Sequence, residues 1–260
     1  MADSDPSGEL LIERKGPVLW LTIAREARRN AMSHAVLAGM AGAIEAAQAD
    51  RAVRAIVITG AGIKAFCAGA DLQSAQAFTT DYSEPVGHLA RLLRCAKASN
   101  VPLVARVNGA CMAGGMGLLA MCDLAVAARH AVFGLPEVRV GVFPAQVLSV
   151  LQHLIPRRKL AELCLTGEPL TASEALELGL VNYVDEDVDA KLDWLLARLL
   201  DKSPAAIRRG LYTMKKIEAM PFEESMSFTE SQIALFTLTE DAKEGQAAFQ
   251  EKRKPRWSGQ

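Results

Sequence analysis

The chain has 260 residues, of which 50% are hydrophobic, and its 29 basic and 30 acidic residues give a net charge of −1. This length allows one large domain with a sizeable apolar core. The near-neutral charge gives no electrostatic reason to expect a nucleic acid or an acidic surface as partner. No apolar stretch reaches the roughly 20 residues that span a bilayer, and residues 1–8 do not read as a signal peptide. We therefore expect a soluble, cytoplasmic protein without a membrane partner.

Cysteine usage agrees with this expectation. The five cysteines are odd in number and lie mostly in apolar runs: Cys67, Cys95, Cys111, Cys122 and Cys164. This pattern favours reduced thiols in a reducing compartment over a disulfide framework.

The first half of the chain alternates between strand and helix patterns. In chain order we expect strands at 10–13 and 18–23 joined by a turn at 15–17, a helix capped by Ser33, a buried strand at 55–59, a helix around 89–96, a strand at 103–107, a helix after the glycines at 114–117, and a strand at 124–127. Such alternation implies right-handed crossovers and a mainly parallel sheet.

The second half is mostly helical. Residues 171–174 form a capping box that opens a short helix, which we expect to stop at Gly179. From Ala190 onward the pattern predicts successive helices, including 207–219, 222–238 and 240–252. We therefore expect an α/β core over residues 1–190 and a helical C-terminal region over residues 191–260.

A glycine-rich turn at residues 59–72 follows a buried strand. It has neither dinucleotide-binding nor P-loop spacing. Two interpretations stay open: a loop whose peptide N–H groups face a ligand, or a plain strand-to-helix turn built on a buried Phe66.

A double glycine, Gly114-Gly115, opens an apolar helix within residues 110–123. Unpaired N–H groups and the positive end of the helix dipole meet there. Such a site favours an oxyanion, and preorganised donors can stabilise a transition state by several kcal/mol. Alternatively, the small residues only let this helix pack closely on its neighbours.

Glu137 lies among apolar residues and glycines in the segment 133–144. Burial would raise its pKa and suit it to take and return a proton near neutral pH. The alternative is a structural contact of Glu137 with Arg139 or with the backbone.

From about Leu10 to Pro255, these motifs together resemble those of the crotonase superfamily, the enoyl-CoA hydratase/isomerase fold. The pieces that carry the resemblance are, in order, residues 66–72, residues 108–123, residues 133–137, and Leu165-Thr166-Gly167 followed by Ala175 and Gly179-Leu180-Val181. The resemblance implies a spiral of ββα units with a C-terminal helical trimerisation region. It also implies a homotrimer or a dimer of trimers.

What the resemblance implies for chemistry is an acyl-CoA substrate whose enolate oxygen meets two peptide N–H groups. By position these belong to Ala70 and Gly114, and Glu137 is the remaining acid/base. Coenzyme A is then part of the substrate, and no separate cofactor or metal is expected.

The same resemblance places the CoA. Its adenine would lie near the loop that holds Lys64, Ala65 and Ala68, and Lys252 would meet the 3′-phosphate, often from a neighbouring subunit. Arg28 would contact the CoA near its pantetheine and phosphates. The basic run around Lys252 equally fits a solvated tail.

Some positions depart from the family pattern. Hydratases of this family typically use two glutamates, but the first of these positions is Gly117 here. An aspartate eight residues after Glu137 would indicate a dienoyl isomerase, and Ala145 stands there, followed by Gln146. Members that move a double bond between positions 3 and 2 can work with one glutamate. Arg25-Glu26-Ala27 also replaces the frequent Asn-Arg-Pro.

Other candidates are weaker. Asp81, Glu84 and His88 lie in a variable segment that forms an acyl-pocket wall in the family. The histidines at 34, 130 and 153 have no metal-ligand spacing. No histidine is placed in sequence to pair with Cys67 or Cys111 as a nucleophile.

We therefore expect an enoyl-CoA hydratase or isomerase that uses Glu137 as its single acid/base. Another acyl-CoA reaction, such as thioester hydrolysis or decarboxylation, is the alternative within the enzymes. A non-catalytic acyl-CoA-binding or RNA-binding relative is the alternative outside them.

Overall fold

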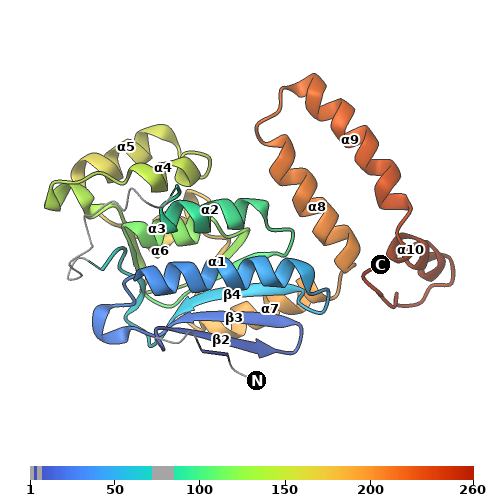
Figure 1. Ribbon diagram of the computed structural model, residues 1–260, viewed down its shortest axis with the longest axis horizontal. Helices are drawn as coiled ribbons and strands as arrows, with labels where there is room; N and C mark the ends of the chain where they lie inside the picture. Colours follow the sequence, from blue (N-terminus) through green and yellow to red (C-terminus); the bar gives the residue numbers. More distant parts are fainter. Residues whose placement is uncertain (1–2, 5–7, 72–84) are drawn as a thin grey trace.

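The computed structural model describes residues 3–4, 8–71 and 85–260, and they form two sheets with helices around them (Figure 1). In order across the larger sheet, the strands are β1 (Asp3–Ser4), β2 (Leu10–Lys15), β3 (Val18–Ile23), β4 (Ala55–Gly60), β6 (Leu103–Val107), β8 (Leu124–Ala128) and β11 (Tyr183–Asp185). Strands β1 to β3 pair antiparallel, and every pair from β3 to β11 is parallel. The expected mainly parallel α/β architecture is confirmed.

The helices complete the fold. They are η1 (Glu26–Arg28), α1 (His34–Ala49), α2 (His88–Ala98), α3 (Gly114–Ala120), η2 (Pro136–Val140), α4 (Ala145–Leu151), α5 (Arg157–Thr166), α6 (Ala172–Glu177), α7 (Val188–Leu200), α8 (Pro204–Ile217), α9 (Phe222–Thr237) and α10 (Glu240–Gln250), with η marking 3₁₀ turns. The predicted caps are confirmed: Ser33 accepts from the Val36 N–H, and Thr171 and Glu174 form the capping box of α6. α6 ends at Glu177, slightly before the predicted stop.

The larger sheet is covered on both faces. Ile56 and Ile58 of β4 belong to one apolar cluster that includes residues of α1, α2 and α3. Ala55 and Val57 point to the other face and belong to the cluster that contains Leu192 of α7. β4 is therefore buried throughout, which explains its continuous apolar sequence.

The smaller sheet was not predicted. It consists, in order, of β10 (Leu170–Thr171), β9 (Val132–Gly134), β7 (Ala110–Met112) and β5 (Ala65–Cys67). Strands of two or three residues are too short to show a hydrophobic period. This sheet nevertheless positions the site, because β5, β7 and β9 bring the three motif segments of the sequence side by side.

The C-terminal helices α8 to α10 contact the core less than the helices that cover the larger sheet. Helices α8 and α9 extend away from the sheets as an antiparallel pair, with α10 and the C-terminus beside the start of α8 (Figure 1). α8 contains no buried residue, and large apolar side chains are exposed on α8 to α10, among them Met214, Phe222, Ile233, Leu238 and Phe249. Among the described residues no helix is long and apolar enough to cross a membrane.

Candidate active site

Two backbone N–H groups meet where the segment after β5 approaches the start of α3. Ala70 forms an isolated parallel bridge with Met32, which donates to the Gly69 carbonyl at 2.8 Å and accepts from the Asp71 N–H at 3.2 Å. Met32 thus bonds to the residues on both sides of Ala70, so the Ala70 N–H points away from it. A Cβ built on Gly114 would lie 3.8 Å from the Ala70 nitrogen.

Neither N–H has an acceptor within the described part of the chain. Gly114 is the first residue of α3, so its N–H has no partner inside the helix. Two donors without acceptors in one region form a candidate site for an oxygen that gains negative charge.

The turn that presents these donors is strained and tightly packed. Ala113 has φ 52° and ψ −124°, a conformation that a residue with a Cβ rarely adopts. The Ala113 N–H donates to the Gly134 carbonyl at 2.8 Å, which helps to hold it there. Gly69 has φ +96°, and a Cβ on it would lie 2.7 Å from the Ala113 Cβ. Glycine at position 69 is therefore required by both conformation and space.

Cys67 lies beneath this turn and is fully buried. Its carbonyl oxygen would lie 2.4 Å from a Cβ on Gly115, and its Sγ accepts from the Gly69 N–H at 3.4 Å. Burial raises the pKa of the Cys67 thiol to about 12, so the thiol is neutral and unreactive at neutral pH. This agrees with the expectation that Cys67 is not a nucleophile.

Glu137 is on η2, three residues after Gly134, whose carbonyl accepts from Ala113. Its Oε2 atom is buried and has no hydrogen-bond partner. Burial raises the pKa of the Glu137 carboxyl. Arg139 does not pair with Glu137; it forms an ion pair with Glu168 at 2.6 Å. The alternative of a Glu137–Arg139 contact is therefore wrong. The alternative of a backbone contact stays open, because a backbone N–H hydrogen bond to the Glu137 carboxyl opposes the rise in its pKa, although burial has the larger effect.

Gly117 is buried on α3 and faces α4. A Cβ at this position would lie 3.3 Å from Cγ2 of Val147, which is 3% exposed. An apolar side chain thus fills the space next to Gly117.

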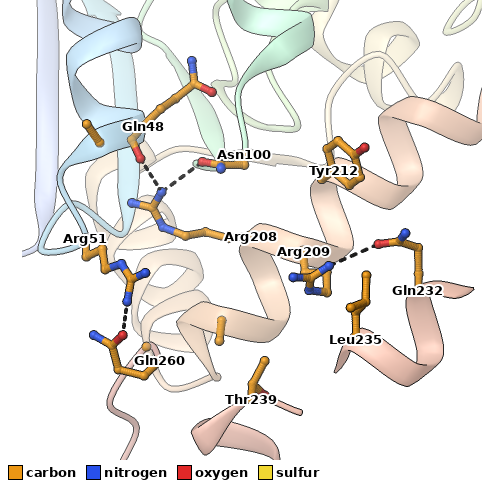
Figure 2. Close-up of a pocket in the computed structure, with 13 residues that line it drawn as sticks. Gln48, Arg51, Asn100, Arg208, Arg209, Tyr212, Gln232, Leu235, Thr239 and Gln260 are labelled. Carbon is orange, nitrogen blue, oxygen red and sulfur yellow. Dashed lines mark hydrogen bonds between the residues drawn. The ribbon is translucent and has the colours of Figure 1, made fainter. Parts of the chain in front are cut away.

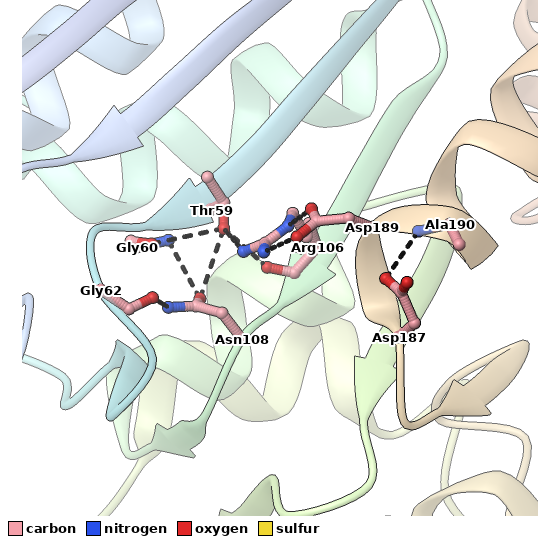
Figure 3. A network of polar contacts seen from close by, with 8 residues as sticks. All are labelled: Thr59, Gly60, Gly62, Arg106, Asn108, Asp187, Asp189 and Ala190. Carbon is pink, nitrogen blue, oxygen red and sulfur yellow. Dashed lines mark hydrogen bonds and ion pairs between the residues drawn. The ribbon is translucent and has the colours of Figure 1, made fainter.

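The loop after β4 is held from inside by two buried asparagines, of which Figure 3 shows Asn108. Asn108 donates to the carbonyls of Gly62 and Ala65, and Asn30 donates to those of Ala61 and Ala65. Nearby, Arg106 of β6 forms a double contact with Asp189 at 2.6 and 2.8 Å.

His130 and Ala110 hold two more carbonyls of this loop. The Nε2 atom of His130 lies 3.0 Å from the Ile63 carbonyl and 3.2 Å from the Asn108 carbonyl, so this nitrogen carries the proton. The Ala110 N–H donates to the Lys64 carbonyl at 3.1 Å. With these carbonyls turned inward, the loop exposes the side chains of Ile63 and Lys64.

The structure brings some of the predicted CoA-contacting residues together. Lys64 is exposed and Ala68 half-buried on the loop, whereas Ala65 is 2% exposed. η1, which carries the exposed Arg28, packs against this loop, since a Cβ on Gly62 would meet the Glu26 carboxylate. Lys252 is different: it follows α10, on the far side of the fold from η1 (Figure 1).

A cavity of about 620 Å³ lies elsewhere, between the end of α1 and helices α8 to α10 (Figure 2). Arg208 donates there to Asn100 and to the carbonyls of Gln48 and Asp50 at the end of α1. None of Ala70, Gly114 and Glu137 lines it. Arg208 caps the C-terminal end of α1 and so has a structural role here. The cavity is separate from the candidate active site.

The weaker candidates are placed as follows. His88, the first residue of α2, packs on His34 with ring centroids 4.5 Å apart. Asp81 and Glu84 lie outside the described residues. Over residues 8–71 and 85–260, no group of three or more histidine, cysteine or acidic side chains could hold a metal ion.

Comparisons with known proteins identify the family of this chain. A family model described as enoyl-CoA hydratase/isomerase matches residues 13–260. The 2,3-dehydroadipyl-CoA hydratase of Escherichia coli (strain K12) is 32% identical over 259 residues, covering 96% of this chain and 99% of that protein. The crotonyl-CoA hydratase of Syntrophomonas wolfei is 32% identical over 249 residues, covering 94% and 96%.

Solved structures show the same similarity. An enoyl-CoA hydratase from Mycobacterium smegmatis superposes with a TM-score of 0.90 at 33% identity, covering 96% of this chain and 98% of that one. The fold is therefore the crotonase fold. The chain belongs to the enoyl-CoA hydratase/isomerase family, as an enzyme of that type.

Proposed function

We propose that this enzyme moves a double bond in an enoyl-CoA, with the Ala70 and Gly114 N–H groups on the thioester oxygen and Glu137 as the only acid/base. The observation that carries the proposal is the environment of Gly117: this residue has no side chain, and Val147 fills the space beside it. Glu137 is thus left to work without a second carboxyl at that position.

The chemistry balances with one carboxyl. Glu137 takes a proton from C2 of a 3-enoyl-CoA, and the electrons shift to the thioester oxygen to form an enolate. The two N–H groups stabilise that charge. Glu137 then returns the proton to C4, which leaves the double bond between C2 and C3. The raised pKa of Glu137 brings it nearer to the working pH and favours both transfers.

Hydration is the second candidate, because the relatives named above are called hydratases. It adds a hydroxyl to C3 and a proton to C2 of a 2-enoyl-CoA. In this chain Glu137 would have to activate the water and supply the proton.

The CoA is proposed to lie across the exposed side of the loop that carries Lys64, next to Arg28. Since Lys252 is far from that loop within one chain, a neighbouring copy would supply it. The exposed apolar side chains of α8 to α10 support association, because such surface is costly to leave in water. A homotrimer, or a dimer of trimers, is the proposed assembly.

The test compares two substrates and two carboxyl variants. Purified protein is offered crotonyl-CoA and a 3-enoyl-CoA, and the products are separated by chromatography. The Glu137→Gln variant is expected to lose at least about 10³-fold in turnover, because the proton carrier is gone. Glu177→Gln, which changes an exposed carboxyl at the end of α6, is the matched control and should behave as wild type.

The outcomes separate the candidates. Turnover of the 3-enoyl-CoA alone supports isomerisation, and turnover of crotonyl-CoA alone overturns it in favour of hydration. Release of free CoA indicates thioester hydrolysis, and loss of CO₂ from a carboxylated acyl-CoA indicates decarboxylation. Binding without any turnover indicates a non-catalytic relative.

A further inference from the structure

Arg25 joins three parts of the chain next to the Ala70 N–H. It follows β3, and its side chain is 12% exposed. Its Nε pairs with Glu9 at 2.8 Å, its Nη2 pairs with Asp71 at 2.6 Å, and its Nη1 donates to the Ala31 carbonyl at 2.5 Å. Each arm of the planar guanidinium thus binds a different segment, a geometry that lysine cannot reproduce.

Two of these contacts flank the bridge that orients Ala70. Asp71 directly follows Ala70, and Ala31 directly precedes Met32, the bridge partner of Ala70. The bridge itself has only the two backbone hydrogen bonds of Met32. The pairing of Arg25 with Asp71, which is 11% exposed, therefore ties both sides of this short bridge to one side chain.

The third contact of Arg25, with Glu9, connects it to the rest of the fold. Glu9 also accepts a hydrogen bond from the Ser33 hydroxyl, which in turn accepts from the Val36 N–H at the start of α1. Glu9 directly precedes β2 and Ser33 caps α1, so the orientation of Arg25 is tied to two elements that are part of the core. Partly buried ion pairs of this kind hold geometry better than exposed ones.

We propose that Arg25 is a positioning residue for the oxyanion site: it fixes the direction of the Ala70 N–H by holding Asp71 and Ala31. In this role Arg25 acts through Ala70 and not on the substrate. This inference rests on the proposed function, because it assigns a role to a residue that supports the same pair of N–H donors.

The test uses variants of the full-length protein with a spectroscopic readout. Arg25→Met removes the three contacts, and Arg25→Lys keeps only a point charge. The matched control is Arg14→Met: Arg14 lies on β2, and the change breaks its exposed ion pair with Asp50. For each variant, kcat and KM are measured on the substrate that wild type converts. The infrared carbonyl band of a bound, ¹³C-labelled enoyl-CoA is recorded as well.

We expect Arg25→Met to lower kcat about 10- to 100-fold, because a misplaced donor stabilises the enolate less. KM should stay within about threefold, since the donors contribute mainly in the transition state. The carbonyl band should move back toward its frequency in free thioester. Arg25→Lys should recover part of both losses, and Arg14→Met should match wild type.

Asp71→Asn provides a second route that preserves side-chain shape. It should change kcat and the carbonyl band in the same direction as Arg25→Met, and the double variant should lose no more than Arg25→Met alone. Folding of every variant is checked by circular dichroism. If folded Arg25→Met keeps the wild-type kcat and carbonyl band, or if the two losses add fully, Arg25 has no such role. Wild type that neither shifts the band nor turns over any enoyl-CoA would instead contradict the proposed function.

Discussion

The two halves of the candidate site are built in opposite ways. On the donor side, which comprises residues 69–71 and 113–115, the turn is fixed by backbone hydrogen bonds, by the glycine at 69 and by the contacts of Arg25. On the carboxyl side, which comprises Gly117, Glu137 and Val147, one carboxyl oxygen is buried without a partner.

This difference matches what the proposed function requires of each half. A developing oxyanion is stabilised only by donors that are already aimed at it, so rigidity is useful on the donor side. A carboxyl that both takes and returns a proton must not be held in its charged form by a cation or by strong donors. Substitutions that displace the N–H groups of the donor side should therefore lower activity. Substitutions that fill the space of the carboxyl side should instead change stability or the product formed.

The largest effect is expected from Gly69→Ala on the donor side. The new Cβ would meet Ala113 Cβ at 2.7 Å, and alanine is strained at φ +96°. Both donors should move, and kcat/KM should fall at least about 100-fold. Gly42→Ala is the matched control: Gly42 lies in α1 with nothing within 4 Å of its Cβ position, so activity should persist and stability rise by about 0.5–1 kcal/mol. Equal activity of the two variants would show that the donor side tolerates displacement.

A smaller effect is expected from Gly117→Glu on the carboxyl side. Alone, this change should destabilise the protein by about 1–3 kcal/mol, because Val147 occupies the adjoining space. Combined with Val147→Ala, the new carboxyl has room, and the ratio of hydration to isomerisation should rise. Val147→Ala alone serves as the control and should not change that ratio. A double variant with the wild-type product ratio would contradict the role that we assign to Gly117 and Val147.

The smallest effect is expected from Glu137→Gln on folding stability, because the buried Glu137 carboxylate destabilises the folded state. Its pKa is raised in the folded state, so folding takes up a proton at pH values between the unfolded and folded pKa. Stability therefore falls as the pH rises through this window. Glu137→Gln should therefore be more stable than wild type at neutral pH. The difference should vanish below about pH 4, where the carboxyl is protonated in both states. Melting curves at both pH values test this, and a constant difference would contradict it.

Long elements were predictable from the sequence, and short ones were not. The strand 55–59 is a continuous apolar run, the helix after Ser33 has a helical period and a cap, and both are confirmed. The four strands of the smaller sheet are only two or three residues long, so they leave no periodic signal. Their positions depend on pairing between distant segments, which no local pattern records.

The candidate site divides in the same way. The chemistry of Glu137 and Gly114 was expected from local sequence, and the roles of Ala70 and the CoA-contacting residues came from the family resemblance. The supporting residues were missed: Arg25 meets Asp71 across 46 positions, and His130 meets Ile63 across 67. An arginine at position 25 and a histidine at 130 look like surface residues until the fold brings their partners to them.

The buried thiol of Cys67 has a practical consequence. It lies under the turn that presents the two donors and bonds to the Gly69 N–H. With its pKa raised to about 12, almost none of it is thiolate at neutral pH while the turn is closed. An alkylating reagent can therefore label this cysteine only during excursions in which the turn opens. The labelling rate of Cys67 would then measure how often this turn, and with it the proposed oxyanion site, opens. The measurement needs no substrate.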